Sequence, residues 1–382
     1  MTARLGLVQS YINTVPDKRM VTDRILQIDP YEIATYSALG TDMGKFNFAN
    51  REGKVYEWLE DTFNPVTDEL DAAITGTTTT TMTLVTDALA QPGDVWLIDS
   101  ELVWVSAVSA TTATITKGYG STTKTTHADS ATITLVSRAR IDGDDADDSP
   151  STEIASNYNY TQIFQRTVNV ARSKQKLAEY GVSSWEDYMI DKYMKELMML
   201  LNKVPYYGKR YAGSASAART AGGFKVFITD NLAYATSTAL TGGTARALTR
   251  ADIDGVLQSI WSDGGNPSLI ITGAWAQRKI NDFYEGFITT ERSEQMGGNL
   301  IKNLLHPISG SNLRIVVDRH CPTNELWVLS PDKIGFYPFD PFFYENLAKT
   351  GDAIKGEVVG EYGFVVAADK HHGAVLEFST TA

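Results

Sequence analysis

Residues 64–140 alternate between short apolar strands and turn residues, and this pattern constrains the fold more than any other feature of the chain. Five consecutive threonines occupy residues 77–81. β-Branched residues favour strands, whereas Gly, Pro, Asp and Ser mark turns. We predict strands around Met82 and Leu84 and at 95–98, 102–105, 113–115 and 131–136, with turns at 92–94, 99–100, 118–120 and 129–130. The sequence therefore predicts an inserted all-β module, a feature that more often serves contacts with neighbours than catalysis.

The charge and cysteine content exclude several classes of protein. A formal charge of −12 argues against general nucleic-acid binding, which needs Lys and Arg to neutralise phosphates. A container for DNA is compatible with this charge, because its wall should not bind tightly to the DNA that it encloses. The single cysteine, Cys321, rules out an internal disulfide framework and suits a reducing cytosol. We find no signal peptide and no run of ~18 apolar residues, so we expect a soluble intracellular protein with no membrane segment.

The flanks of the module are predicted to mix helix and strand. Residues 1–45 read as an extended arm with one short helix, and residues 45–59 read as strand. After the module, the acidic run at 142–148 resists burial and marks a solvated linker. Residues 153–170 are polar and aromatic, and four side chains are expected to anchor them, namely Tyr158, Tyr160, Ile163 and Phe164.

A long amphipathic helix is the clearest element that the sequence predicts. Ser183 and Glu186 have the spacing of a capping box, and Pro205 is expected to end the helix. Apolar residues continue at helical spacing, and the methionines Met194, Met198 and Met199 are expected to fill gaps in the core. About twenty residues at ~1.5 Å each give a rod of roughly 30 Å.

The C-terminal half alternates shorter helices and strands, which makes the class α+β. A helix is predicted at 249–261, with Thr249 as its N-cap, an apolar face that includes Trp261, and Gly264 and Gly265 as its stop. A second helix carries Trp275, Ile280 and Phe283. Strands are predicted at 224–228, 269–271, 313–317, 326–329, 356–359, 364–367 and 374–378.

Residue types that carry chemistry form no convincing catalytic or metal constellation. Ser173 and Lys176 fit S-x-x-K, but the common alternative is a solvated helix edge. His320 beside Cys321 invites a zinc site, which needs three or four ligands. The tandem His371 and His372, if placed on a strand, would point to opposite faces. The prediction is a protein that is not an enzyme and has no catalytic residue, metal or cofactor.

Two further binding sites are conceivable in and beside the module. Asp142, Asp144, Asp148 and Glu153 fall at positions 1, 3, 7 and 12 of a calcium loop, but Gly143 is not at the position where such a loop requires glycine. The alternative is an exposed loop. Trp96 and Trp104 could form an aromatic platform for a glycan, although tryptophans on paired strands more often pack in the core.

Three stretches give the chain its resemblance to a known family. The first is residues 25–61, with Ile28-Asp29-Pro30 and Tyr56-Glu57-Trp58. The second is the module, with Val103-Trp104-Val105 and Thr116-Lys117-Gly118. The third contains Asn159-Tyr160-Thr161-Gln162, the long helix and Thr220-Ala221-Gly222-Gly223. In their order they resemble the major capsid proteins of tailed bacteriophages with the Hong Kong-type fold. The resemblance is closest to a branch with a β-domain in its extended loop.

This resemblance implies a subunit of an icosahedral head that encloses double-stranded DNA without sequence-specific binding. It implies an N-terminal arm at 1–45, an extended loop at 46–150 with its β-insertion at 64–140, and a spine helix at 183–204. The peripheral domain would take 151–228 and 333–370, and the axial domain 229–332 and 371–382. Because the family-like sequence begins near Asp23, the resemblance implies that the long N-terminal scaffolding segment of many relatives is missing, either because it is cleaved or because it is supplied as a separate protein.

The implied partners are other copies of the chain, in pentamers and hexamers, with portal and scaffolding proteins and a decoration protein, and no membrane. The expected location is the virion, after assembly in the host bacterial cytoplasm. Two alternatives stay open. One is an encapsulin-like compartment shell with the same fold, and the other is a glycan-binding surface protein that uses the module. A hydrolase has no support in the sequence.

Overall fold

The structure is a computed structural model that describes residues 25, 28–40, 53–86, 90–143, 152–177, 181–234, 246–284, 303–349 and 351–380. The chain divides into two compact units, Leu59–Ser156 and the combination of Met1–Trp58 with Asn157–Ala382. The predicted arm, apart from residues 25 and 28–40, lies outside the described residues, as do most of the acidic run and residues 285–302.

The unit at 59–156 is all β. It contains six strands, namely β2 Thr67–Glu69, β3 Thr81–Thr83, β4 Asp94–Ile98, β5 Glu101–Ser109, β6 Thr112–Lys117 and β7 Thr132–Arg138. They form one sheet in the order β2-β7-β4-β5-β6-β3, which is antiparallel throughout. An antiparallel bridge between Leu70 and Leu84 joins the two outer strands, so the sheet closes on itself. Alternate residues point inward and form an apolar core, for example Trp96, Val103 and Ile115. The predicted strands are confirmed, and only the short, polar β2 was not predicted.

The other unit contains a mixed six-stranded sheet with the order β10-β17-β14-β11-β13-β12. Its strands are β10 Leu232–Tyr234, β11 Leu269–Thr272, β12 Asn303–Leu305, β13 Asn312–Val317, β14 Glu325–Leu329 and β17 Gly373–Leu376. Helices α5 Arg250–Ser262 and α6 Ala274–Tyr284 bury one face of it, with Ile270 and Val328 in that core. The opposite face buries Ile271 and Trp327. Both faces are covered, which explains why β11 and β14 are apolar throughout.

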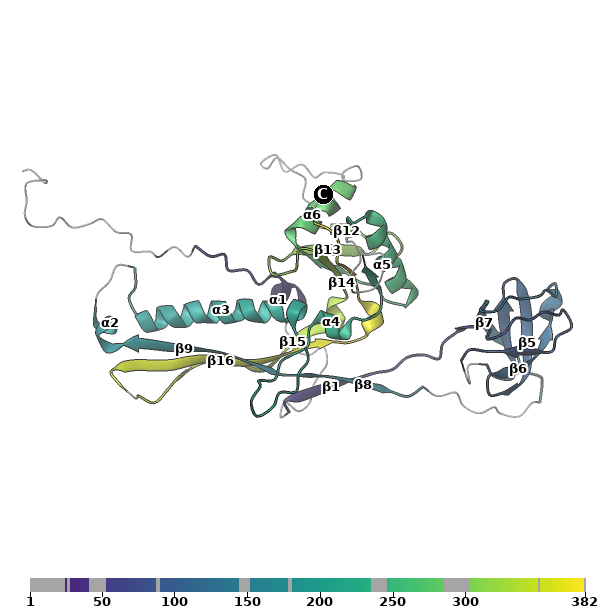
Figure 1. The fold of residues 1–382 in the computed structure, drawn as a ribbon, viewed down its shortest axis with the longest axis horizontal. Coiled ribbons are helices and arrows are strands. Elements are labelled where there is room, and N and C mark those ends of the chain that lie inside the picture. The colour runs from purple at the N-terminus through teal and green to yellow at the C-terminus, as the bar shows by residue number, and fades with distance from the viewer. Residues whose placement is uncertain are drawn as a thin grey trace, which may run out of the picture. The chain divides into compact units, whose positions relative to one another are not determined.

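A second, three-stranded antiparallel sheet in the same unit has the order β15-β16-β9, with β9 Gln162–Ala171, β15 Ile334–Asn346 and β16 Ala353–Val366. The long helix α3 Trp185–Tyr207 lies along β9 and β16 (Figure 1). Strands β1 Val55–Glu60 and β8 Ala155–Tyr160 pair separately. Short helices complete the unit, namely α1 Ala34–Leu39, α2 Arg172–Lys176, α4 Phe224–Phe227, and the 3-10 turns Pro331–Lys333 and Asp369–His371.

The ends of α3 differ from the prediction. Its N-cap is Ser184, whose hydroxyl accepts a hydrogen bond from the Asp187 N–H at 3.3 Å, so the predicted Ser183–Glu186 box is wrong. Glu186 instead accepts a hydrogen bond from the Tyr344 hydroxyl at 2.8 Å. Pro205 does not end the helix. The helix continues for two residues beyond it, to Tyr207, and Tyr206 is only 1% exposed.

Residues 224–228 form a helical turn, so the predicted strand there is wrong. Phe224 and Phe227 are both buried, and a three-residue spacing brings two side chains to one face only in a helix. The helix α5 is confirmed, with Thr249 and Asp252 forming its capping box. Trp261, predicted on its buried face, is 50% exposed.

Two long strands were not predicted, β9 and β15. Ile163 and Phe164 were both expected to anchor the chain, but neighbours in a strand face opposite sides. Phe164 is buried in the core, whereas Ile163 is 53% exposed. The strands predicted at 356–359 and 364–367 are parts of the single strand β16. The mixture of helices and sheets confirms the α+β class.

Candidate assembly site

Strands β1 and β8 pair at the place where the chain leaves for the β unit and returns from it. We call this place the root, and buried side chains fix it firmly. Tyr56 on β1 is buried, and its hydroxyl accepts a hydrogen bond from the Phe364 N–H at 2.6 Å and donates one to the Phe364 carbonyl at 3.0 Å. A Cβ at Gly363 would overlap the Tyr56 ring, so this close approach requires glycine. Trp58 is buried two residues further on and packs against Phe227, with ring centroids 5.4 Å apart.

Asn159 holds the returning strand β8 in the same way. Its side chain is fully buried, and Nδ2 donates to the carbonyls of Gly222 at 3.1 Å and Phe364 at 2.6 Å. Its Oδ1 accepts from the Gly222 N–H at 2.9 Å, and Oε1 of Gln162 accepts from the Ala221 N–H at 3.2 Å. The Asn-Tyr-Thr-Gln segment therefore fastens β8 and β9 to the glycine-rich passage and to β16.

A third contact set in this region involves charge. The guanidinium of Arg219 forms an ion pair with Glu361, and its Nε donates to the Thr161 carbonyl at 2.9 Å. The Thr161 hydroxyl donates to the same Glu361 carboxylate. Together these groups fix the base of the loop at 208–220 against β16, beside the root formed by β1 and β8.

A buried carboxylate fixes the first described helix. Asp318 follows β13 and is fully buried, and its Oδ2 accepts hydrogen bonds from Thr35 Oγ1 at 2.5 Å, Asn202 Nδ2 at 2.7 Å and the Tyr206 hydroxyl at 3.2 Å. Its Oδ1 accepts from the His320 N–H at 2.8 Å. Burial, with the nearby Cys321 and Asp318, raises the pKa of Tyr206 well above its usual value, so its hydroxyl stays a donor. This cluster joins α1, α3 and the end of β13.

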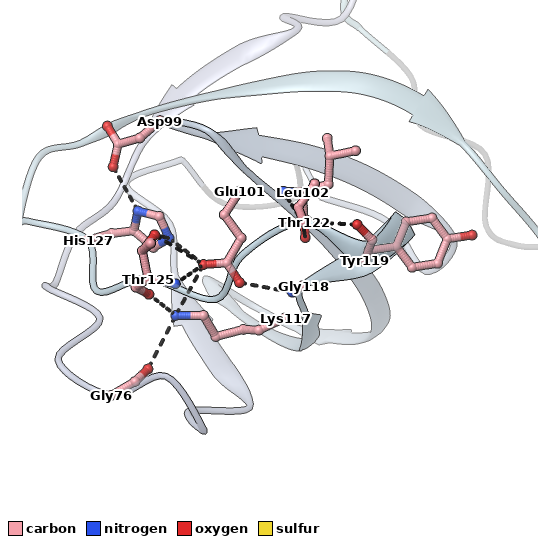
Figure 2. A network of polar contacts seen from close by, with 10 residues as sticks. All are labelled: Gly76, Asp99, Glu101, Leu102, Lys117, Gly118, Tyr119, Thr122, Thr125 and His127. Carbon is pink, nitrogen blue, oxygen red and sulfur yellow. Dashed lines mark hydrogen bonds and ion pairs between the residues drawn. The ribbon is translucent and has the colours of Figure 1, made fainter.

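The β unit contains its own buried charge cluster (Figure 2). Glu101 accepts hydrogen bonds from the N–H groups of Gly118 at 2.9 Å and Thr125 at 2.8 Å. His127 Nε2 lies 2.9 Å from Glu101 and its Nδ1 lies 2.7 Å from Asp99.

The other charge in this cluster is the ammonium of Lys117, which lies 3.6 Å from Glu101 and donates to the carbonyls of Gly76 and Thr125. Burial alone would raise the pKa of Glu101. The hydrogen bonds and the Lys117 charge outweigh burial, so the pKa is lowered and the carboxylate stays charged. The cluster ties together three loops of the β unit, those between β2 and β3, between β4 and β5, and between β6 and β7.

The residues considered for chemistry do not come together. Ser173 and Lys176 are exposed on α2. Burial raises the pKa of the Cys321 thiol, which favours the inert protonated form. Among the residues that the structure describes, no group of three His, Cys, Asp or Glu side chains could hold a metal ion. Asp142 and Gly143 are exposed, and Asp144 and Asp148 of the hypothetical calcium loop lie outside the described residues.

The paired histidines and tryptophans also differ from the expectation. His371 and His372 do not lie on a strand, because residues 369–371 form a 3-10 turn. His372 is buried, with Nδ1 accepting from the Ser330 N–H at 3.1 Å and Nε2 donating to the Ala367 carbonyl at 3.0 Å. Trp96 lies in the core of the β unit. Trp104 pairs with Val95 and so faces the other side of the sheet, and the two rings do not form one platform.

None of the helices within the described residues has the length and hydropathy that crossing a membrane requires. No curated protein matches the chain in sequence.

Solved structures with a similar fold come from protein shells. The capsid of cyanophage A-1(L) is 15% identical with a TM-score of 0.49, covering 64% of this chain and 85% of the other. The capsid of a native GTA particle is 8% identical with a TM-score of 0.49, covering 97% of both chains. The SrpI encapsulin of Synechococcus elongatus is 10% identical with a TM-score of 0.42, covering 60% of this chain and 79% of the other. Because these TM-scores are below 0.5, the family of this chain follows instead from its sequence match to a family model.

The sequence matches the family model of the SU10 major capsid protein over residues 7–379, nearly its whole length. The match includes both compact units and the root that joins them. The chain therefore belongs to the SU10 major capsid protein family and is a structural subunit of a phage head.

Proposed function

We propose that copies of this chain associate as pentamers and hexamers into a closed icosahedral wall around double-stranded DNA. The family match supports the role of a shell subunit. The firmly fixed root supports a mechanism in which the β unit contacts neighbouring copies. Large obligate interfaces bury roughly 2,000–5,000 Å². A separately folded unit on a paired ribbon can add such area without a larger core.

We infer the division into parts from the resemblance, and the cores support it. Residues 229–332 and 371–382 would form the axial domain, and they contain all six strands of the larger sheet. Residues 151–228 and 333–370 would form the peripheral domain, with α3 as its spine beside β15-β16-β9. Residues 46–150 would be the extended loop, and residues 1–45 the arm, whose end Asp318 fixes at Thr35.

Exposed apolar side chains next to the root mark where the extended loop would meet a neighbour. Leu59 is 71% exposed, Phe63 is fully exposed and Ile154 is 62% exposed. Large apolar side chains exposed together are more often contact surfaces than solvent-facing ones. Covering them in an assembled shell would remove this apolar area from water.

The remaining parts of the proposal follow the family role. The shell would be built in the host bacterial cytoplasm with portal and scaffolding proteins, and would take a decoration protein. It would carry no catalytic activity and touch DNA without sequence specificity. An encapsulin-like compartment is the alternative within the same fold. Portal and terminase genes beside this one would favour the phage head, and a gene for a cargo enzyme would favour the compartment.

Deletion of residues 66–138 tests the role of the β unit. The Val66 carbonyl accepts a hydrogen bond from the Leu135 N–H at 2.7 Å, so the first and last strands of the β unit run side by side and a Gly-Ser link can join Pro65 to Ala139. The remaining unit keeps its own two cores and should stay soluble. We expect few or fragile shells by electron microscopy. A full-length Glu101→Gln variant, which weakens the β unit without removing it, is the matched control. Shells as numerous and heat-resistant as those of the full chain would contradict this role.

A further inference from the structure

Threonines of the β unit form a regular array on one of its outer faces. Met82 of β3 and its partner Ala113 of β6 are buried in the core, so the residues on either side of them point outward. The outward residues of both strands are all threonines, namely Thr81, Thr83, Thr112, Thr114 and Thr116. Directly opposed side chains lie ~5 Å apart across the two strands, and alternate ones ~7 Å apart along each strand. None of the five hydroxyls has a hydrogen-bond partner within the described part of the chain, so this face is a grid of free hydroxyls.

This face has no charge, although the unit that contains it is strongly acidic. Residues 59–156 contain 16 Asp and Glu but only 4 Lys and Arg, a net charge of −12 that equals the formal charge of the whole chain. Strands β3, β5 and β6 contain only two charged residues, Glu101 and Lys117. Both are buried and belong to the cluster in Figure 2. The outward side chains of the three strands are therefore all uncharged.

Two aromatic rings stand at one end of the array. Trp104 lies opposite Thr116 on β5, between two buried valines, so its ring is on the same outer face. Its Nε1 donates to the Ala139 carbonyl at 3.0 Å, which fixes the orientation of the ring. The ring of Tyr119 lies beside it, with centroids 6.5 Å apart and planes 21° from parallel. Tyr119, and not Trp96, is therefore the aromatic partner of Trp104.

The buried cluster of the β unit fixes the turn that presents Tyr119. Glu101 accepts a hydrogen bond from the Gly118 N–H at 2.9 Å. The Thr122 hydroxyl accepts one from the Leu102 N–H at 3.1 Å and donates to the Tyr119 carbonyl at 2.9 Å. Figure 2 shows the Tyr119 ring directed away from the cluster, and 38% of the residue is exposed. Because the turn is already ordered, a ligand that binds there loses little free energy in ordering it.

We propose that the face formed by Trp104, Tyr119 and the five threonines binds a neutral polysaccharide. The C–H groups on one side of a sugar ring pack on the aromatic rings, and the sugar hydroxyls exchange hydrogen bonds with the threonine hydroxyls. A chain of uncharged sugars matches the flat shape, the free hydroxyls and the lack of charge of this face. This binding is an activity of the β unit in addition to shell assembly, and it does not require the shell.

The chemistry of the face distinguishes this ligand from other partners. Nucleic acids and acidic glycans need cations opposite their phosphates or carboxylates, and the outward positions of β3, β5 and β6 have none. The cores of protein–protein interfaces are enriched in aromatic residues, Met and Arg. Five of the seven residues proposed here are threonines, which suit a ligand rich in hydroxyls better than a second protein.

Affinity electrophoresis of the full-length protein tests the proposal. The unassembled protein is run in native gels that contain dextran, mannan, galactan or a β-glucan, beside a reference protein without affinity for sugars. A gel with alginate tests an acidic polysaccharide. We expect retardation by at least one neutral polysaccharide and none by alginate. No retardation by any of the four neutral polysaccharides, or equal retardation by alginate, would overturn the proposal.

Two variants locate the binding on this face. Y119A removes the exposed ring, and T81V/T114V removes one cross-strand pair of hydroxyls while it keeps the β-branched shape. Each should weaken the apparent affinity about 10-fold with unchanged thermal unfolding. The T67V/T134V variant makes the same change at a cross-strand pair of β2 and β7 and should bind like the unaltered protein.

Three results of this comparison would contradict the site. They are full affinity in both test variants, an equal loss in the T67V/T134V control, and normal affinity combined with a failure to form shells in the test variants. The last result would show that the face joins copies of the chain instead. Because binding is measured on the unassembled protein, a failure of shell assembly in the unaltered protein would not affect this test.

Discussion

Asp318 keeps a carboxylate inside the protein with no Lys or Arg paired to it among the described residues. Neutral donors replace the cation, namely the Thr35 and Tyr206 hydroxyls, the Asn202 amide and the His320 N–H. A buried charge is tolerated only when its hydrogen-bonding capacity is met in this way. At the residue scale, this one buried side chain joins α1 to α3, beside the apolar packing of Leu39.

Replacing Asp318 with asparagine tests this arrangement. The new amide group would bring two more donors to a position already surrounded by donors, and we expect a loss of about 3 kcal/mol in the free energy of unfolding. Chemical denaturation measures this loss. Asp352→Asn removes the same charge from an exposed pair with Arg172 and should cost less than ~1 kcal/mol. Equal stability of the two variants would refute the role of Asp318.

His372 predicts a pH dependence. Burial lowers its pKa to about 4, so the folded protein keeps the ring neutral while the unfolded chain binds a proton below pH ~6.5. The free energy of unfolding should therefore fall as the pH drops from ~6.5 towards 4, by up to ~3 kcal/mol. His372→Gln can keep both hydrogen bonds but does not titrate, so its profile should be flatter. Parallel profiles of the two proteins would contradict the assignment.

At the element scale, elements with a local signal could be predicted from the sequence, and those that depend on distant partners could not. The helix α5 has its cap, its apolar face and its glycine stop in one short stretch, and it was predicted almost to the residue. The choice between Ser183 and Ser184 depends on Tyr344, which takes Glu186 away from the cap. The strand β9 lacks regular alternation, and its pairing with β16 specifies it instead.

The candidate site was only partly predictable for the same reason. The Asn-Tyr-Thr-Gln segment stands out in sequence through its resemblance to relatives. The function of Asn159 depends on Gly222 and Phe364, which lie 63 and 205 residues further along the chain. No local pattern indicates partners at that distance, so the buried hydrogen bonds at the root became visible only in the fold.

Asn159→Ala should loosen the root without unfolding the β unit. The N–H groups of Gly222 and Tyr160 and the Gly222 carbonyl lose their Asn159 partner, and the Phe364 carbonyl keeps only the Tyr56 hydroxyl. This should cost about 2–3 kcal/mol. Hydrogen exchange should quicken at the Gly222 amide, while the amides of β4 and β5 stay protected by their own core. Asn157→Ala removes only a local bond to the Tyr158 N–H and is the matched control. Faster exchange in β4 would show that the two units are coupled more tightly than we argue.

At the scale of the whole molecule, the chain combines two independently packed units of unequal charge. The Thr-rich pattern predicted an inserted β module, and residues 59–156 form a compact β unit with its own core of alternating residues. The family, indicated by the order of motifs, is confirmed by the match over residues 7–379. The roles of the units in a shell depend on surfaces that a single copy leaves exposed, and sequence patterns alone do not define those surfaces.

Electron microscopy of the purified full-length protein after size-exclusion chromatography, over a range of protein and salt concentrations, tests the central claim most directly. The proposed function predicts closed shells, or rings of five and six subunits. A protein that stays monomeric at every protein and salt concentration would contradict the claim that this chain assembles a shell by itself.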